Sequence, residues 1–416
     1  MSSSLATLGG LQRPGLPVLE RARLRSPATL VRAQITTRAT LLGADGLSWS
    51  DVGADTPRFH AAARRLLLEG QRTNLIRNAR GEGALAGTPG TLPTNWSSST
   101  SAGGIARSVL GYETINGVSC VLVRFAGTAS ANGTLTILWE PAAQLAGTAG
   151  QVFAVSAVLR AVHAGTAPTL RLGVREVPSN TDHAQIVTAD ASLRRATILH
   201  TVVDTAATSL RPGLSILFLT GQVIDTTIAI GFAQTELARF ASSPILPAPG
   251  APATATRGAD LVQVSLASLG IGTAGACTLL GAALVPETVS DANQHLLSID
   301  DGAGNNMFHL YVSPAGQLVT RRVTAGNAAS LTRACPANTL FRFGISIDGA
   351  GRMASTLDGA AVQAVTGGPS GGLGTLRLGH RPGGSEGLFG EIASLQVLRF
   401  AVSDAALVGM AAAQPG

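Results

Sequence analysis

The chain has 416 residues, of which 45% are hydrophobic, 13% are charged and 4% are aromatic. This length suggests about two or three domains. The high apolar content and a net charge of only +6 exclude a chain that is disordered throughout. All 30 basic side chains are arginine, so chemistry that needs a lysine, such as a Schiff base or a P-loop, is also excluded.

The positive charge is concentrated near the N-terminus. Residues 1–80 contain 12 arginines and five acidic residues, a balance of +7, so the remaining 336 residues sum to −1. No aromatic residue precedes Trp49, and the stacking platforms of a single-strand nucleic-acid binder are therefore missing. Residues 1–34 show no helical or strand period, so we expect an extended basic arm that attaches to an acidic protein surface; a solvated arm is the alternative. The candidate attachment residues are Arg13, Arg21, Arg23, Arg25 and Arg32.

Neither a membrane span nor a secretion signal is expected. The apolar runs are shorter than the about 18 residues that a transmembrane helix needs, and no basic region followed by an apolar one opens the chain. The cysteines Cys120, Cys277 and Cys335 lie too far apart in the sequence for a metal knuckle or a CxxC motif, so we expect buried free thiols. Synthesis in the cytoplasm fits these features.

Short apolar runs follow the arm in chain order. Residues 35–59 alternate in polarity around the turn GADG, which predicts a hairpin connector. Residues 58–70 (RFHAAARRLLLEG) fit either a short helix or a buried strand. Many runs of about five to nine residues then occur up to residue 262, rich in Val, Ile, Leu and Thr and bounded by Gly, Asn, Asp or Pro. This pattern is typical of antiparallel sandwiches, because no long helical segment separates the runs.

A Pro- and Ala-rich joint at 242–260 places a domain boundary near residue 262. Strand-like runs resume after it, with turn dipeptides such as Asp348–Gly349 and Asp358–Gly359 between them. Ser403 is a good N-cap for a short helix near the end of the chain. The sequence therefore predicts an all-β chain with two antiparallel β-sandwich (jelly-roll) domains, 60–262 and 263–416, after an extended N-terminal arm.

Motifs of catalysis are missing. Glycoside hydrolysis needs two carboxylates about 5–10 Å apart, and no such cluster stands out in the sequence. The GxSxG and HExxH motifs are absent, and the seven histidines are scattered. We expect no enzyme and no cofactor, and a glycan depolymerase is the less favoured alternative.

One loop is rich in oxygen ligands. The segment 298–306 (SIDDGAGNN) carries carboxylates and amides that hard cations favour, but it lacks the bidentate Glu of an EF-hand. A Gly-assisted hairpin turn explains the same residues. We expect no metal site, and calcium binding at 300–306 stays open as an alternative.

Several segments resemble bacteriophage particle proteins. Residues 57–78 (PRFHAAARRLLLEGQRTNLIRN) resemble a signature in which Pro-Arg-Phe and an apolar run precede Glu and Arg-Thr-Asn-Leu. Residues 87–133 resemble the sandwich that follows this signature, and residues 232–260 resemble its closing strand and exit linker. The tail resembles a concanavalin A-like (laminin G-like) jelly roll in three pieces, namely TLDG (356–359), LRLGHRPGG (376–384) and residues 388–407.

The resemblance covers about residues 35–416 and implies a virion spike, fibre or decoration of a phage or phage-like particle. It also implies that the sandwich at 60–262 is similar to carbohydrate-binding ones. Such a protein would be made in the bacterial cytoplasm and attached by its arm to capsid, portal or tail proteins. Its ligand would be host capsule or lipopolysaccharide. A surface with few charges favours packing into a homo-oligomer, and neither nucleic acid nor membrane insertion is expected.

Glycan sites usually combine an exposed aromatic ring with hydrogen-bonding groups. Trp96, in the LPTNW loop, is the candidate of the first sandwich, and a plug at the sandwich end is the alternative; Trp139 is expected in the core. His309 and Tyr311 are two residues apart and so share one face of a strand. Arginines nearby would suit an acidic polysaccharide. The candidate glycan-binding residues are Trp96, His309, Tyr311, Arg321, Arg377, His380 and Arg381.

The leading hypothesis is thus a virion protein that attaches by its N-terminus and binds a host-surface glycan. A purely structural decoration or connector protein without a ligand is the alternative, because a solvated polar face accounts equally well for each candidate residue.

Overall fold

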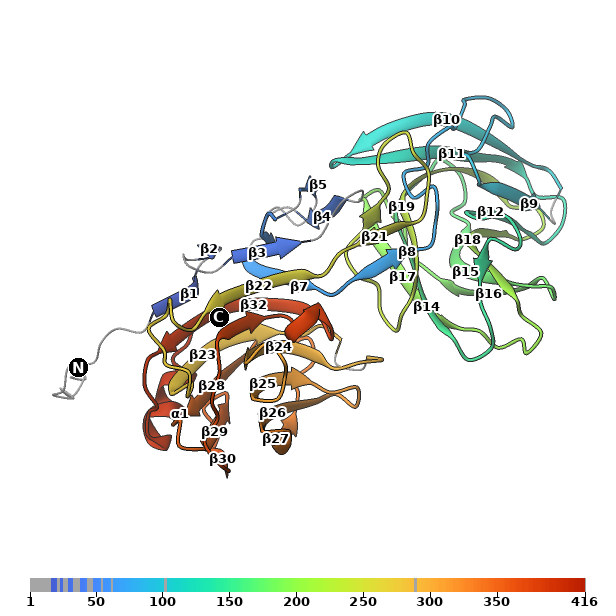
Figure 1. The fold of residues 1–416 in the computed structure, drawn as a ribbon. Helices are drawn as coiled ribbons and strands as arrows, with labels where there is room; N and C mark the ends of the chain where they lie inside the picture. Colours follow the sequence, from blue (N-terminus) through green and yellow to red (C-terminus); the bar gives the residue numbers. More distant parts are fainter. Residues whose placement is uncertain are drawn as a thin grey trace.

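The computed structural model describes residues 16–20, 23–24, 29–32, 38–42, 48–53, 55–60, 63–100, 103–287 and 290–415. Its regular structure is almost entirely antiparallel β, with two packed β-sandwiches, so the predicted fold class is confirmed. Figure 1 shows the two sandwiches as separate lobes, the first drawn from cyan to green and the second from orange to red. Among the described residues, no helix is long and apolar enough to cross a membrane.

The first sandwich consists of a five-stranded and a six-stranded sheet. In spatial order, the five-stranded sheet contains β10 (Ile105–Ile115), β11 (Val118–Thr128), β19 (Val223–Leu237), β14 (Val152–His163) and β17 (Arg194–Thr201). The six-stranded sheet contains β16 (Thr181–Ile186), β15 (Thr169–Val177), β18 (Ser209–Phe218), β12 (Gly133–Leu138) and β9 (Ser97–Thr100), with β13 (Leu145–Ala146) beside β18.

The core of the first sandwich lies between these two sheets. Its largest fully buried side chains are Trp139, Phe125, Phe153 and Phe218, so the prediction for Trp139 is confirmed. Strands such as β11 alternate buried and open positions because successive side chains of a strand point to opposite faces. Apolar burial of this kind contributes about 25 cal/mol for each Å² removed from water.

The second sandwich consists of a nine-stranded and a seven-stranded sheet. The nine-stranded sheet runs β2 (Arg23–Leu24), β1 (Leu16–Glu20), β32 (Phe389–Leu398), β23 (Cys277–Leu284), β28 (Phe341–Ile347), β29 (Arg352–Leu357) and β30 (Gln363–Thr366), and β7 (Arg65–Glu69) pairs with both β32 and β6 (Arg58–His60). The seven-stranded sheet runs β27 (Asn327–Ala334), β26 (Gln317–Thr324), β25 (Met307–Val312), β24 (Gln294–Asp300), β31 (Thr375–Leu378), β22 (Asp260–Ser265) and β3 (Thr29–Arg32).

Two short helical elements complete the second sandwich. The 3₁₀ turn η1 (Pro382–Gly384) follows β31, and α1 (Asp404–Ala412) packs on the outer face of the nine-stranded sheet. Ser403 caps α1, as predicted, because its Oγ accepts a hydrogen bond from the Ala406 N–H at 3.4 Å. Leu407 and Ala411 are the buried side chains of this helix.

The N-terminal segment differs from the extended arm that we expected. β1 pairs with β32, and β3 pairs with β22, so these two N-terminal strands belong to the two sheets of the second sandwich. Val18 and Leu19 are each 2% exposed within it. Local sequence patterns do not reveal this arrangement, because the pairing partners lie hundreds of residues away along the chain.

The predicted attachment residues fall at the edge of the described structure. Arg13, Arg21 and Arg25 lie outside the described residues. The backbone of Arg23 belongs to β2 and that of Arg32 to β3, and both side chains lie outside the described part of the chain. Their role in attachment stays a prediction.

Two small sheets combine strands that precede the first sandwich in the sequence with strands that follow it. β4 (Arg38–Leu42) and β5 (Trp49–Val52) form an antiparallel pair at the position of the predicted hairpin, and β20 (Ile245–Leu246) joins them. β8 (Arg72–Asn74) pairs with β21 (Ala255–Arg257). The segment that fitted either a helix or a strand contains the strands β6 and β7, and it buries Leu66 and Leu68 against the second sandwich.

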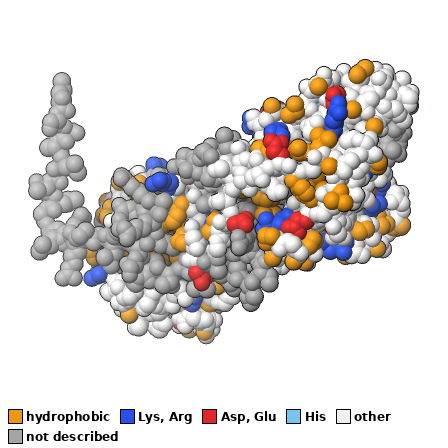
Figure 2. All heavy atoms as spheres, turned by 90° about the horizontal axis from the view of Figure 1, so that it is seen from above, with side chains coloured by type: hydrophobic (Ala, Val, Ile, Leu, Met, Phe, Trp, Pro, Cys, Tyr) orange, Lys and Arg blue, Asp and Glu red, His pale blue; other side chains and the backbone are white. Residues whose placement is uncertain are grey.

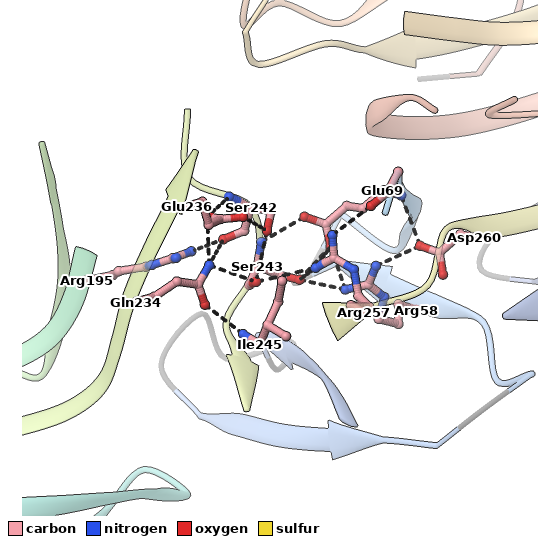
Figure 3. Close-up of polar contacts among 11 residues, drawn as sticks. Arg58, Glu69, Arg195, Gln234, Glu236, Ser242, Ser243, Ile245, Arg257 and Asp260 are labelled. Carbon is pink, nitrogen blue, oxygen red and sulfur yellow. Dashed lines mark hydrogen bonds and ion pairs between the residues drawn. The ribbon is translucent and has the colours of Figure 1, made fainter. Parts of the chain in front are cut away.

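A buried network of charges joins the two sandwiches (Figure 3). Arg58 is fully buried, and its Nη atoms lie 2.7 Å from Glu69 Oε2 and 2.7 Å from Asp260 Oδ2. Arg257 is also fully buried, with Nη1 3.0 Å from Glu69 Oε2. Ser243 donates to Glu69 from its N–H at 2.8 Å and from its Oγ at 2.5 Å. Glu69 therefore lies at the centre of four donors.

The network continues into the first sandwich. Glu236 on β19 accepts hydrogen bonds from Ser242 N–H at 2.9 Å and from Gln234 Nε2 at 2.8 Å. Arg195 on β17 donates to the Ser242 carbonyl at 2.6 Å. The network thus connects strands of both lobes, and we call it the joint network, comprising Arg58, Glu69, Arg195, Gln234, Glu236, Ser242, Ser243, Arg257 and Asp260.

The joint network explains two of the sequence signatures. The segments 57–78 and 232–260 are separated by more than 150 residues in the sequence, yet they supply every member except Arg195. Buried charges are tolerated only when they are paired and hydrogen-bonded. Residues from these two segments therefore supply most of the polar contacts that join the two sandwiches.

Charged side chains are dispersed on the face of the molecule that Figure 2 shows. Figure 2 shows one face of the molecule, on which acidic and basic side chains are scattered among neutral and apolar ones. Cys120 and Cys277 are buried free thiols, as predicted, and burial raises the pKa of each to about 12, whereas the free thiol Cys335 is only half-buried.

Candidate functional site

Four of the seven predicted glycan-binding residues line a single cavity of about 220 Å³ in the second sandwich. They are His309, Tyr311, Arg321 and Arg381. We call this cavity the histidine pocket; its lining residues are Asn293, Gly304, Met307, His309, Tyr311, Arg321, Val323, Gly326, Arg381 and Glu386. It is smaller than the about 300–1,000 Å³ of pockets for drug-sized ligands, so its size suits a single ring or a small acidic group.

The strand register brings these residues together. β24, β25 and β26 are neighbours in the seven-stranded sheet, and His309 lies directly opposite Arg321 across the β25–β26 pair. His295 on β24 lies opposite Tyr311. On β25, Phe308 packs into the core of the sandwich, whereas His309 and Tyr311 point to the other face, as the period of a strand requires. The loop after β31 supplies Arg381 and Glu386.

Three rings stack beneath the pocket. The ring centroids of His295 and His309 are 5.1 Å apart, and Tyr311 lies 5.0 Å from each of them. His295 is fully buried and His309 is 5% exposed. This stack fixes both imidazoles in orientation, because close-packed rings leave little freedom to rotate.

A hydrogen bond links the two histidines. His295 Nε2 lies 2.8 Å from His309 Nδ1, so one of these two nitrogens carries the proton between them. Glu386 Oε2 lies 3.3 Å from His295 Nδ1, but His295 Nδ1 is buried without a hydrogen-bond partner among the described residues. His309 Nε2 is also buried and has no hydrogen-bond partner in the described part of the chain.

The surroundings keep both imidazoles neutral. Burial, together with the positive charges of Arg321 and Arg381, lowers the pKa of His309 to about 2. Burial lowers the pKa of His295 to about 4, although Glu386 opposes this shift. Both rings are therefore uncharged at neutral pH.

The pocket carries one excess positive charge. Arg381 Nη1 donates to Glu386 Oε1 at 2.9 Å, and Asn293 Nδ2 donates to Glu386 Oε2 at 3.0 Å. Burial raises the pKa of Glu386, but Asn293, His295 and Arg381 outweigh this effect and the net pKa is lowered, so the carboxylate is charged. Arg321 has no ion pair within the described part of the chain, and its Nε is buried without a partner. An anionic group would neutralise it.

Glu386 is held in an uncommon backbone conformation. Its φ is +54°, in the left-handed region that non-glycine residues rarely adopt. Its carbonyl accepts a hydrogen bond from the His295 N–H at 3.1 Å. The side-chain and backbone contacts together hold this residue in place over the histidine stack.

Three predicted residues lie elsewhere. Trp96 is 8% exposed and packs on Trp139, and its indole N–H donates to the Asn78 carbonyl at 3.3 Å. No ring face is free for a sugar, so this residue is a plug at the sandwich end. Arg377 is engaged by Asp300 at 2.8 Å, and His380 is 1% exposed. We therefore remove these three residues from the candidate site.

Sequence reasoning missed His295, Asn293 and Glu386. His295 belongs to the stack only because of the β24–β25 register, which shifts at a bulge between His295 and Leu297. Glu386 reaches it from a loop about 90 residues later. The only available signal was the Glu beside the Gly-rich turn after β31, and it does not point to a partner.

The carboxylates of the segment 298–306, the alternative calcium site, are engaged by protein groups. Asp301 accepts hydrogen bonds from the N–H groups of Ala303, Gly304 and Asn306 at 2.7–2.9 Å. Asp300 is paired with Arg377. Within the described ranges, no group of three or more His, Cys, Asp or Glu side chains is placed to hold a metal ion.

No protein-family model matches the sequence, and no curated protein matches it. Part of the chain is similar to the CBM40 of the Ruminococcus gnavus IT-sialidase bound to α2,3-sialyllactose. The sequence identity is 20%, the similarity covers 35% of this chain and 86% of that chain, and the TM-score is 0.29. The family 11 carbohydrate-binding module of Clostridium thermocellum is 12% identical, with 40% of this chain and 95% of that chain covered and a TM-score of 0.26. A heptameric SAP-like pentraxin of Limulus polyphemus is 18% identical, with 32% of this chain and 69% of that chain covered and a TM-score of 0.27.

Carbohydrate-binding modules are thus among the solved proteins that are similar in fold to part of this chain. The ligands in these titles belong to those proteins. At these TM-scores the similarity identifies no ligand for the present chain.

Proposed function

We propose that the chain binds an acidic saccharide in the histidine pocket, without catalysis. The observation that carries this proposal is the Arg321 guanidinium, which borders a preformed cavity and has no ion pair among the described residues. A guanidinium presents a planar fork of donors that matches a carboxylate in two parallel hydrogen bonds. His309 Nε2, which has no partner among the described residues, and the Tyr311 hydroxyl are then available for hydrogen bonds with sugar hydroxyl groups.

The chemistry of the pocket supports binding rather than hydrolysis. Glycosidases use two carboxylates that flank the scissile bond, and Glu386 is the only acidic residue among those that line the pocket. Its oxygens are engaged by Arg381 and Asn293. We therefore assign the site to recognition.

We further propose that the protein acts in a virion or phage-like particle, as a tail fibre, head spike or decoration. The support is the resemblance of residues 57–78, 232–260 and the tail to phage particle proteins. In this setting the ligand is an acidic host capsule or lipopolysaccharide. Other virion proteins, namely capsid, portal or tail, contact the N-terminal segment, and the chain assembles as a homo-oligomer.

Calorimetric titration of the purified full chain tests the binding proposal. The probes are oligosaccharides of glucuronate, mannuronate and sialic acid, each compared with its carboxyl-reduced form. We expect at least one acidic probe to bind, and the reduced form to bind at least about tenfold more weakly, since hydrogen bonds to charged groups contribute about 1.5–3 kcal/mol. Equal affinity for both forms, or no binding by folded protein, would contradict the proposal.

A pair of arginine variants locates the site. Arg321→Gln should weaken binding of the acidic probe about tenfold or more. Arg194→Gln is the matched control, because the side chain of Arg194 is 66% exposed in the first sandwich, and it should leave the affinity for the probe unchanged. Shortening of the probe during incubation would instead favour the depolymerase alternative. An Arg321→Gln variant that binds like the wild type would place the ligand elsewhere.

A further inference from the structure

A second cavity adjoins the histidine pocket and lies between the two sandwiches. Its volume is about 300 Å³, and Asn293 and Glu386 line both cavities. One wall comes from residues 70–72 and Phe240, next to strands of the first sandwich and the joint network. The other wall comes from residues 290–294, 384–387 and Phe389 of the second sandwich. The two cavities are neighbours that share the lining residues Asn293 and Glu386, and we call them together the joint groove.

The joint groove contains an arginine that is stacked on two aromatic rings. The Arg72 guanidinium carbon lies 4.3 Å from the ring centroid of Phe389 and 5.1 Å from that of Phe240. The two rings meet edge to face at 5.0 Å. Arg72 Nε is buried without a partner, and the side chain forms no ion pair with a described residue. Burial lowers the pKa of Arg72, which nonetheless remains a cation at neutral pH.

Stacking leaves the edge of this guanidinium available. The donors of an arginine lie in the plane of the group, so a ring against its face does not occupy them. The neighbouring carboxylate of Asp291 is instead paired with Arg239, at 2.7 Å between Nε and Oδ1. Arg72 therefore repeats the feature that marks Arg321, namely a half-buried cation at the wall of a cavity, with a buried Nε that has no partner and no ion pair among the described residues.

The joint network holds this cation in place. Arg257 Nη2 donates to the Gly70 carbonyl at 3.1 Å, and Gly70 N–H donates to the Leu388 carbonyl at 2.9 Å. Arg72 follows two residues later and pairs through β8 with Arg257 on β21. The position of Arg72 relative to the histidine pocket is thus set by a rigid, buried assembly and not by a free loop.

We propose that the ligand is a chain with several acidic residues that occupies the whole joint groove. One anionic group contacts Arg321 and Arg381 in the histidine pocket, and a later one contacts Arg72 between the sandwiches. This inference rests on the proposed function and specifies its substrate class as a polyanionic glycan of more than two residues. Both sandwiches then belong to one binding site.

The dependence of affinity on chain length tests this inference. Calorimetric titration of the full chain compares a disaccharide with a hexasaccharide of the acidic probe that the wild type binds best. We expect the wild type to gain at least about tenfold in affinity from the longer chain, because a second charged contact is added. For Arg72→Gln we expect this gain to shrink below about threefold, whereas Arg194→Gln should keep the wild-type ratio.

The outcomes separate the two proposals. A wild type that binds disaccharide and hexasaccharide equally, or an Arg72→Gln variant with the full gain, overturns the extended groove and leaves the histidine pocket intact. A wild type that binds neither probe contradicts the proposed function itself. The melting temperature of each variant checks folding, and Arg72→Lys provides a second test, since it keeps the charge but loses the planar fork and should recover only part of the gain.

Discussion

Removing the charge of Glu69 should destabilise the whole molecule. Glu69 accepts from Arg58, Arg257 and Ser243 in the joint network, and it is 5% exposed. Burial raises its pKa, but the two guanidiniums and Ser243 outweigh this effect and lower it well below the ordinary range. The variant Glu69→Gln keeps the shape of the side chain and leaves a buried network with one uncompensated positive charge.

The magnitude follows from the burial of both partners. Removing one member of a buried ion pair costs about 3–5 kcal/mol, because the remaining charge loses its compensation in a medium that solvates it poorly. The measurement is urea unfolding followed by tryptophan fluorescence, with Trp96 and Trp139 reporting on the first sandwich. We expect the free energy of unfolding to fall by about 3–5 kcal/mol.

The pH dependence provides a second readout for the same variant. A carboxylate whose pKa is lowered in the folded state stabilises it above the unfolded pKa of about 4.5, and this contribution is lost as the pH falls below that value. The wild type should therefore lose stability below about pH 4.5 more steeply than Glu69→Gln does.

A matched control separates burial from charge removal as such. Glu113→Gln removes a carboxylate that is paired with Arg160 and is 42% exposed, so it should cost no more than about 1 kcal/mol. If Glu69→Gln and Glu113→Gln cost the same within error, the reasoning about the joint network is refuted.

Three further predictions concern the second sandwich. The pKa values of His295 and His309 are lowered in the folded state, so just below pH 6.5 only the unfolded state takes up protons at these sites. The melting temperature of the wild type should therefore fall as the pH decreases from about 6.5 to 4, and it should fall less in the double variant His295→Gln/His309→Gln. Gly351 has φ +126°, and a Cβ there would lie 1.9 Å from the Gly367 carbonyl oxygen, so Gly351→Ala should cost at least about 1–3 kcal/mol in urea unfolding. Deletion of residues 1–32 removes β1 to β3 and should lower the melting temperature by several degrees, and an unchanged value would show that these strands contribute no stability.

The candidate site could be predicted in part. His309 and Tyr311 are two residues apart on one strand, so their common face follows from the period of β structure alone. Arg321 was expected on the same or a neighbouring strand, and Arg381 was expected in the turn after a strand end. His295 and Glu386 were not, because their contacts depend on a bulged register and on a loop from a distant part of the chain.

Some residues looked equivalent in the sequence and are not. Arg377 and Arg381 are four residues apart, yet Arg377 is engaged by Asp300 while Arg381 lines the pocket. Trp96 lies in a loop of polar and turn residues, but its ring packs against Trp139 in the core. The exposure of these side chains depends on contacts with residues that are distant in the sequence, and local sequence patterns do not predict such contacts.

The sequence by itself determined the all-β class, the two sandwiches and the burial of Trp139, because runs of β-branched residues bounded by turns have a local physical cause. Only the tertiary structure decided that β1 and β3 pair with strands of the second sandwich, that Arg58 and Glu69 contact Arg257 and Asp260, and that two cavities share lining residues at the joint. These features rest on contacts between residues far apart in the chain, and their energy comes from desolvated charges whose partners are set by packing.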